Sequence, residues 1–183
     1  VQYLQSMDQR AYEMVLAHGE VAGTIPWHFI DKATGEAATY TDHPTIWIDY
    51  RANPDLHGID PIGYKETGWS PDVAHQGSIS YLPYLLTGDQ YYLDQMQAQN
   101  SWSILQYSPS KSRPWFRDSE SGDYEMSNTQ VREYAWFLRD LAYSSWITPD
   151  TDPLKGYLQD VTADVIQSLV ERFPGGGQNG GAL

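Results

Sequence analysis

Apolar and aromatic residues recur every three or four positions along most of this sequence, a spacing that places them on one face of an α-helix. Gly19 is expected to end the first helix and Asp89 to cap the third. On the fourth helix, the residues expected to share one side are Val131, Ala135, Leu138, Ala142 and Ser145. The pattern predicts a mainly α fold, with helices over residues 2–18, 75–86, 90–106, 128–146 and 152–173.

One region departs from the helical period. Residues 24–30 and 45–50 are short, β-branched and aromatic, and residues 31–36 between them favour a turn. A small β-hairpin is therefore predicted near residues 25–50. Residues 51–71 hold three prolines, three glycines and no period, so a long ordered loop is expected there. Residues 108–127 are expected to form a second polar loop.

Charge and composition exclude several classes of function. The chain has 24 acidic and 11 basic residues, and its net charge of −13 disfavours nucleic acid and anionic membrane surfaces as partners. No apolar run approaches the roughly 18 residues that a membrane span needs. The absence of cysteine excludes disulfides, thiolate metal sites and cysteine nucleophiles. Nucleotide-binding, hydrolase-elbow and zinc-protease motifs do not occur.

The length of 183 residues predicts a single domain, with residues 174–183 as a flexible tail. The first residue is not methionine, so we expect either that a leader was removed or that the chain is a piece of a longer protein. The compartment stays open between cytoplasm and export.

A short pattern occurs twice. Thr87, Asp89 and Leu93 fit the form T-x-D-x-x-x-L, and the same form recurs from Thr148 to Leu154. Each copy follows a helix rich in tyrosine and tryptophan and opens another helix. The repeat predicts stacked α-hairpins, and chance similarity between two helix caps is the alternative.

Two segments carry a family resemblance. Residues 68–89 (GWSPDVAHQGSISYLPYLLTGD) resemble the hairpins of six-hairpin glycosidase-like proteins, in which a helix ending in Tyr-Leu-x-Thr-Gly-Asp precedes another that opens with Tyr-Leu. Residues 132–143 (REYAWFLRDLAY) resemble the inner helix of such a hairpin. The resemblance covers about residues 69–172 and implies a partial α/α toroid. A complete toroid has about six hairpins and this chain has room for about three, so it implies a fragment or a homo-oligomer.

The same resemblance implies catalytic carboxylates at one mouth of the toroid. The candidates are Asp72 and Glu133, because glycoside hydrolysis uses one carboxyl group as acid and another as base or nucleophile. His75 follows Asp72 by three residues, so the pair could act as a general base with its orienting carboxylate if a helix has begun there. The alternatives are structural: Asp72 as a helix cap, His75 in an ordinary hydrogen bond, and Glu133 solvated or paired with Arg132 or Arg139.

Aromatic residues suggest a sugar-binding surface, since the face of an indole ring suits the C–H face of a sugar. Trp69 and Trp115 lie in polar loops, where packing explains them less well than it explains the other tryptophans. The predicted substrate-binding set is completed by Tyr81, Arg132 and Trp136. Residues 55–60 have acceptor spacing, but a turn is favoured over a metal site, so no metal and no cofactor are predicted.

The predicted function is a carbohydrate-active enzyme, most simply a glycoside hydrolase with paired carboxylates. A polysaccharide lyase is the nearest alternative, with Tyr81 or Tyr84 as proton donor. A non-catalytic carbohydrate-binding or structural module is the alternative from another class. Carbohydrate is the expected partner, and a homo-oligomer is expected to form through residues 128–146 or 152–173, because an incomplete toroid exposes apolar flanks.

Overall fold

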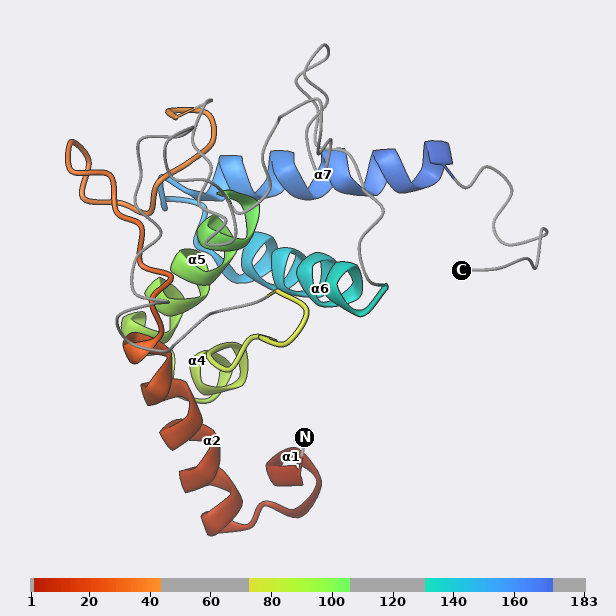
Figure 1. Cartoon of the computed structure of the whole chain (residues 1–183). Coiled ribbons are helices and arrows are strands. Elements are labelled where there is room, and N and C mark those ends of the chain that lie inside the picture. Colours follow the sequence, from red (N-terminus) through yellow and green to blue (C-terminus); the bar gives the residue numbers. More distant parts are fainter. Residues whose placement is uncertain (1, 44–72, 106–130, 173–183) are drawn as a thin grey trace.

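The computed structural model describes residues 2–43, 73–105 and 131–172, and these are mainly helical (Figure 1). The predicted fold class is therefore confirmed at this level. None of the helices in these ranges combines the length and apolar character that crossing a membrane requires. The helices are α1 (Gln2–Ser6), α2 (Gln9–Val21), α4 (Tyr81–Thr87), α5 (Gln90–Leu105), α6 (Val131–Ile147) and α7 (Lys155–Arg172), with a 3-10 turn η1 (Ala22–Thr24) after α2.

The helices stack in sequence order: α2 contacts α4, α4 contacts α5, α5 contacts α6, and α6 contacts α7. Figure 1 shows α6 and α7 lying alongside each other, with α5 meeting them at one end. Short connections join α4 to α5 and α6 to α7, and the two helices of each pair are in contact. Closure into a toroid stays a prediction.

The first predicted helix is wrong in two respects. It is broken at Met7, whose φ of 53° is left-handed, and Asp8 then caps a new helix by accepting from the Arg10 and Ala11 amides at 2.9 and 3.3 Å. Gly19 does not end α2. It lies buried inside the helix, where an added Cβ would sit 2.7 Å from the Pro83 side chain. The glycine therefore permits close packing of α2 on α4.

The second predicted helix begins later than expected, at Tyr81 instead of residue 75, because residues 73–80 form turns and bends. Pro83 is tolerated in α4 because it lies in the first turn, where backbone N–H groups have no helical partner. Gly88 then ends α4 with a φ of 67°, and the carboxylate of Asp89 accepts the Tyr91 amide at 2.9 Å. The predicted cap at Asp89 is confirmed.

The predicted β-hairpin is only partly visible. The chain reverses over residues 31–36 as predicted, and Ile30 and Ala37 form an isolated antiparallel bridge. The Ala38 amide donates to the Phe29 carbonyl at 2.8 Å beside it. Residues 2–43 contain no strand, and the second predicted strand, residues 45–50, lies outside the described ranges.

Val131, Ala135, Leu138, Ala142 and Ser145 share one side of α6 as predicted, but that side is not the buried one. Val131, Ala135 and Ala142 are exposed, and the buried residues are Glu133, Tyr134, Phe137, Asp140, Leu141 and Ser144. The apolar spacing could not locate this side, because half of the buried residues are polar and are satisfied by tertiary contacts. Asn100, for example, donates to the Ser144 hydroxyl at 2.5 Å.

The two T-x-D patterns do not play the same role. Asp89 caps α5, whereas the side chain of Asp150 is 97% exposed and lies 3.7 Å from Lys155. Before α7 it is Asp152 that accepts a backbone amide, from Leu154 at 2.8 Å. This turn delays the start of α7 to Lys155, three residues after the predicted start. The shared feature is the helix–turn–helix arrangement and not the cap.

Helix α5 is the centre of the packing. Thirteen of its 16 residues are buried, including six with amide or hydroxyl side chains between Gln95 and Ser103. Trp102 packs against Trp27 with ring centroids 6.3 Å apart, and both are almost fully buried. Because α5 is enclosed on several sides, its side chains reach regions that belong to different parts of the chain.

Candidate functional site

Two of the predicted site residues, Arg132 and Trp136, lie on one side of α6, and two more, His75 and Tyr81, lie on a segment beside it. Arg132, Trp136, Arg139 and Tyr143 follow one another at intervals of four, three and four residues, so they form one stripe along the helix. We call these four residues the α6 stripe. The segment that carries His75 and Tyr81 lies against it, as the contacts below show. Of the other predicted residues, Trp69, Asp72 and Trp115 lie outside the described ranges.

His75 contacts the N-terminal end of the stripe. Nη2 of Arg132 lies 2.8 Å from Nε2 of His75. A guanidinium group can only donate, so Nε2 of His75 accepts this hydrogen bond and the ring proton is on Nδ1. The predicted sharing of a helix face by Asp72 and His75 is wrong, because residues 73–75 form a turn and α4 begins at Tyr81.

A buried carboxylate fastens the same segment to α6. The carboxylate of Asp140 accepts a hydrogen bond from Nε of Arg139 at 2.9 Å and forms an ion pair with Nη2 of the same guanidinium, also at 2.9 Å. It also accepts a hydrogen bond from the Ser78 amide at 3.0 Å. Asp140 is 5% exposed. Burial raises its pKa from 3.8 to about 6, against the opposing effects of Arg139 and the Ser78 amide. A Cβ on Gly77 would sit 2.8 Å from Nη2 of Arg139, so a larger residue here would make the guanidinium shift.

Two buried oxygen atoms accompany that contact. Oε1 of Gln76 and Oγ of Ser78 have no hydrogen-bond partner within the part of the chain that the structure describes. Buried polar atoms are normally satisfied, because leaving one without a partner costs about 1–3 kcal/mol. The segment beside the stripe is thus held in a costly conformation, which is common at functional sites.

Aromatic rings flank the guanidinium of Arg139. Its Cζ lies 5.7 Å from the ring centroid of Trp136 and 5.9 Å from that of Tyr143. Tyr143 in turn stacks on Tyr81, with centroids 3.8 Å apart and planes within 6° of parallel. These side chains are partly exposed. The stripe therefore offers flat ring faces next to hydrogen-bond donors.

Glu133 does not lie on the stripe. It is 9% exposed and belongs to the buried side of α6, about 100° around the helix from Arg132. The alternative that Glu133 is a solvated surface residue is wrong. Its role as a catalytic carboxylate stays a prediction, as does that of Asp72.

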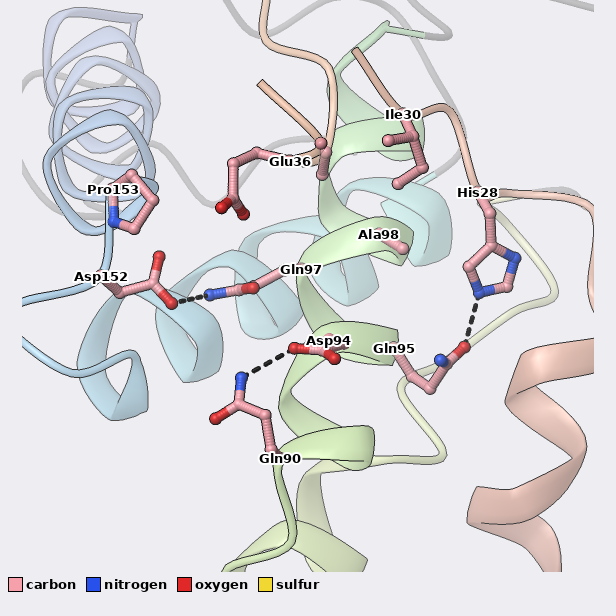
Figure 2. A pocket seen from close by; sticks show the side chains of 12 residues that line it. His28, Ile30, Glu36, Gln90, Asp94, Gln95, Gln97, Ala98, Asp152 and Pro153 are labelled. Carbon is pink, nitrogen blue, oxygen red and sulfur yellow. Dashed lines mark hydrogen bonds between the residues drawn. The ribbon is translucent and has the colours of Figure 1, made fainter. Parts of the chain in front are cut away.

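A second site lies against the first half of α5. A pocket of about 390 Å³ is enclosed by residues 28–37, the first half of α5, and Asp152 with Pro153 (Figure 2). Its polar lining consists of the carboxylates of Glu36, Asp94 and Asp152, the amides of Gln90, Gln95 and Gln97, and the imidazole of His28. We call it the glutamine pocket.

Hydrogen bonds orient the walls of the glutamine pocket. Gln90 donates to Asp94 at 2.7 Å, and Gln97 donates to Asp152 at 2.8 Å (Figure 2). Nε2 of His28 lies 2.6 Å from Oε1 of Gln95, so the imidazole donates here. Each glutamine thus holds a neighbour with one end of its amide group.

The two sites lie on opposite sides of α5. Gln97 lines the glutamine pocket, while Gln99 donates to the backbone carbonyl of Gln76 at 3.0 Å, next to His75. Residues two apart in a helix point about 200° apart. The sequence analysis missed the pocket because it is formed by three distant segments. Its acids at the starts of α5 and α7 look like ordinary helix-start residues.

Within residues 2–43, 73–105 and 131–172, no group of three or more histidine, aspartate or glutamate side chains could hold a metal ion. The comparisons with protein-family models, with curated proteins and with solved structures found no match to this chain. The chemistry of the two sites is therefore the basis for a functional proposal.

Proposed function

We propose that this protein is a carbohydrate-active enzyme that binds sugar units along the α6 stripe. The observation that carries the proposal is the run of flat side chains from Trp136 through Arg139 to Tyr143, continued by Tyr81. A pyranose ring has an apolar C–H face and a rim of hydroxyl groups. Aromatic faces bind the first, and guanidinium or imidazole groups bind the second.

Within this class we propose glycoside hydrolysis with Asp72 and Glu133 as the carboxylate pair. His75 contacts Arg132, the residue before Glu133. Asp72 precedes His75 by three residues, so chain connectivity limits their Cα–Cα separation to about 11 Å. One carboxyl group would protonate the glycosidic oxygen, and the other would act as base or nucleophile.

A polysaccharide lyase is the second candidate, and the contact between His75 and Arg132 favours it. A lyase removes the proton next to a uronate carboxylate and expels the glycosidic oxygen. Arginine can neutralise that carboxylate, and a neutral histidine or a tyrosine can accept or return the proton. Arg132 and His75 supply two of these functions at the N-terminal end of the stripe, and Tyr81, stacked on Tyr143, lies at its other end.

The product separates the two reactions. We would incubate the protein with chromogenic glycosides and with neutral and acidic polysaccharides, recording reducing ends and ultraviolet absorbance. Hydrolysis yields reducing ends alone, whereas elimination also creates an unsaturated sugar that absorbs in the ultraviolet. Absence of both products on the whole panel would contradict the enzyme proposal and favour a non-catalytic binding module.

Substitutions test the assignment of roles. D72N and E133Q are expected to lower kcat by about a hundredfold or more with binding retained, because an amide cannot transfer the proton. W136A is expected to weaken sugar binding by removing a ring face. D160N, at an exposed position of α7, is the matched control for loss of one negative charge. Unchanged kcat in both D72N and E133Q would exclude the proposed pair.

We further propose that the chain forms a homo-oligomer through the apolar surface of α6 and α7. Trp146 is 83% exposed, and Ile166 and Val170, one turn apart on α7, are also exposed. Exposed apolar residues that gather on one face of a soluble protein favour a partner surface, and the commonest partner is a second copy. Light scattering that reports only a monomer, at high protein concentration and moderate salt, would contradict this.

A further inference from the structure

The glutamine pocket presents an excess of hydrogen-bond acceptors. The side-chain nitrogens of Gln90 and Gln97 donate to Asp94 and Asp152. Their side-chain carbonyl oxygens are then left to accept hydrogen bonds from other partners. No residue in the described ranges donates to Oε1 of Gln97, although only 5% of this residue is exposed. A ligand that fits these walls must bring several donors of its own.

Gln95 supplies the complementary group. It is also buried, and its oxygen is occupied by His28, so its amide nitrogen remains as a donor at the pocket wall. Figure 2 shows Gln95 and His28 on one side of the pocket, and Asp152 with Gln97 on the other. One ligand can therefore donate to the acid side and accept from Gln95.

Charge narrows the class of ligand. Glu36, Asp94 and Asp152 line the pocket, and no lysine or arginine is among its described lining residues. The carboxylate of Glu36 has no side-chain hydrogen bond within the described ranges, and Figure 2 shows it reaching toward the side of the pocket where Asp152 lies. Several carboxylates without a basic partner repel anions and attract a positive group.

The size and spacing of the pocket walls do not suit a metal ion. No cluster of acidic and histidine side chains in the described ranges could hold a metal ion. The pocket volume of about 390 Å³ lies in the lower part of the range for organic ligands, which is about 300–1,000 Å³. A single sugar-sized molecule is the appropriate scale.

We infer that the glutamine pocket binds a polyhydroxylated amine, in the form of a sugar unit with a free ammonium group. The ammonium group would lie among the carboxylates of Glu36 and Asp152, and hydroxyl groups would donate to Asp94 and to Oε1 of Gln97. The amide of Gln95 would donate to a hydroxyl or ring oxygen. This site is separate from the α6 stripe, so the inference does not rest on the proposed catalytic function.

Binding of simple sugars tests the inference directly. We would titrate the full chain with glucosamine by calorimetry at mildly acidic pH, and with glucose, N-acetylglucosamine and glucuronate as comparisons. Glucosamine is expected to bind about tenfold or more tightly than glucose and N-acetylglucosamine, glucuronate is expected to bind least, and added salt is expected to weaken glucosamine binding. Equal binding of glucose and glucosamine would overturn the ammonium assignment, and no binding of any of them would overturn the site.

Two variants locate the binding. E36Q removes a charge without removing a hydrogen bond between described side chains, so its fold should be unaffected, and it is expected to weaken glucosamine binding about three- to tenfold. D152N is expected to act in the same direction, and also to loosen its contacts with Gln97 and Leu154. D160N is the control for net charge. Wild-type affinity in E36Q would overturn the proposed placement of the ammonium group.

The test also separates this inference from the proposed function. W136A, on the α6 stripe, should leave glucosamine binding in the pocket unchanged. A protein that binds glucosamine but acts on no glycan would contradict the enzyme proposal and leave the pocket assignment intact. A protein that is active but does not bind glucosamine would do the reverse.

Discussion

The α6 stripe and the glutamine pocket are both built against α5, yet their chemistry is opposite. The stripe combines two arginines with aromatic faces and contacts His75, whereas the pocket is lined by three carboxylates, three amides and His28. A chain with a net charge of −13 has thus gathered two of its 11 basic residues on one helix face. The difference indicates that the two regions suit ligands of different charge, even if both ligands are sugars.

The largest effect should come from the packing that the two regions share. W102A removes a ring that is almost fully buried in α5 against Trp27, and it should lower the free energy of unfolding by about 3–5 kcal/mol. Denaturant unfolding measures this, and binding at both sites should weaken together. A loss below about 1 kcal/mol would mean that α5 does not support the two sites jointly.

The next largest effect concerns Asp140, beside the α6 stripe, and it depends on pH. The pKa of Asp140 is raised in the folded protein from 3.8 to about 6, so the folded state binds this proton more tightly than the unfolded state. The ionised carboxylate therefore opposes folding above about pH 6, and this cost is lost as the pH falls toward 4. The shift corresponds to about 3 kcal/mol.

D140N tests that linkage. Its unfolding free energy should fall less between about pH 4 and pH 7 than that of the wild type, because asparagine does not titrate. D160N, which removes an exposed carboxylate, should retain the wild-type slope. Parallel pH profiles of D140N and wild type would show that Asp140 is not the group responsible.

Two glycine-to-alanine variants, G77A and G156A, test the comparison further. In G77A the new Cβ would sit 2.8 Å from Nη2 of Arg139 and push the guanidinium away from Asp140, which should cost about 1–2 kcal/mol. In G156A nothing lies within 4 Å of the new Cβ, and this helical site should gain about 0.5–1 kcal/mol instead. Thermal unfolding of both variants measures the difference, and equal effects would contradict a tight contact at Gly77.

The smallest expected effect concerns the repeated T-x-D pattern. D89A removes the carboxylate that caps α5 at the edge of the glutamine pocket and should cost about 1 kcal/mol. D150A removes an exposed side chain that only approaches Lys155, and should cost less than about 0.5 kcal/mol. Similar costs for the two variants would restore the equivalence of the two patterns.

The features that could be predicted from the sequence are those whose causes lie within a few residues of one another. The cap at Asp89, the chain reversal at residues 31–36 and the extent of α5 follow from side chains within a few positions of one another. The break at Met7 had a usable signal in the capping residue Asp8, which the apolar period concealed. The late start of α4 was hidden in the same way, because an apolar pattern can extend past the helix it belongs to.

For the candidate site, the sequence analysis singled out His75, Tyr81, Arg132 and Trp136, which the structure places on the α6 stripe or on the segment beside it. His75 reaches the stripe from a turn and not from a helix, and its partner in the described structure is Arg132. Arg139, Asp140 and Tyr143 were not among the predicted site residues, although Arg139 follows Trp136 by three residues and Tyr143 follows Arg139 by four, a spacing that was available as a signal.

What the sequence alone determined is the helical class, the cap at Asp89 and the chain reversal at residues 31–36, because hydrogen bonding and periodicity act between near neighbours. What only the tertiary structure decided is which side of α6 is buried, why Gly19 and Gly77 lack side chains, and that Glu36, Asp94 and Asp152 share a pocket. These depend on contacts between segments tens of residues apart, where burial of polar groups is permitted only by partners that no local pattern specifies.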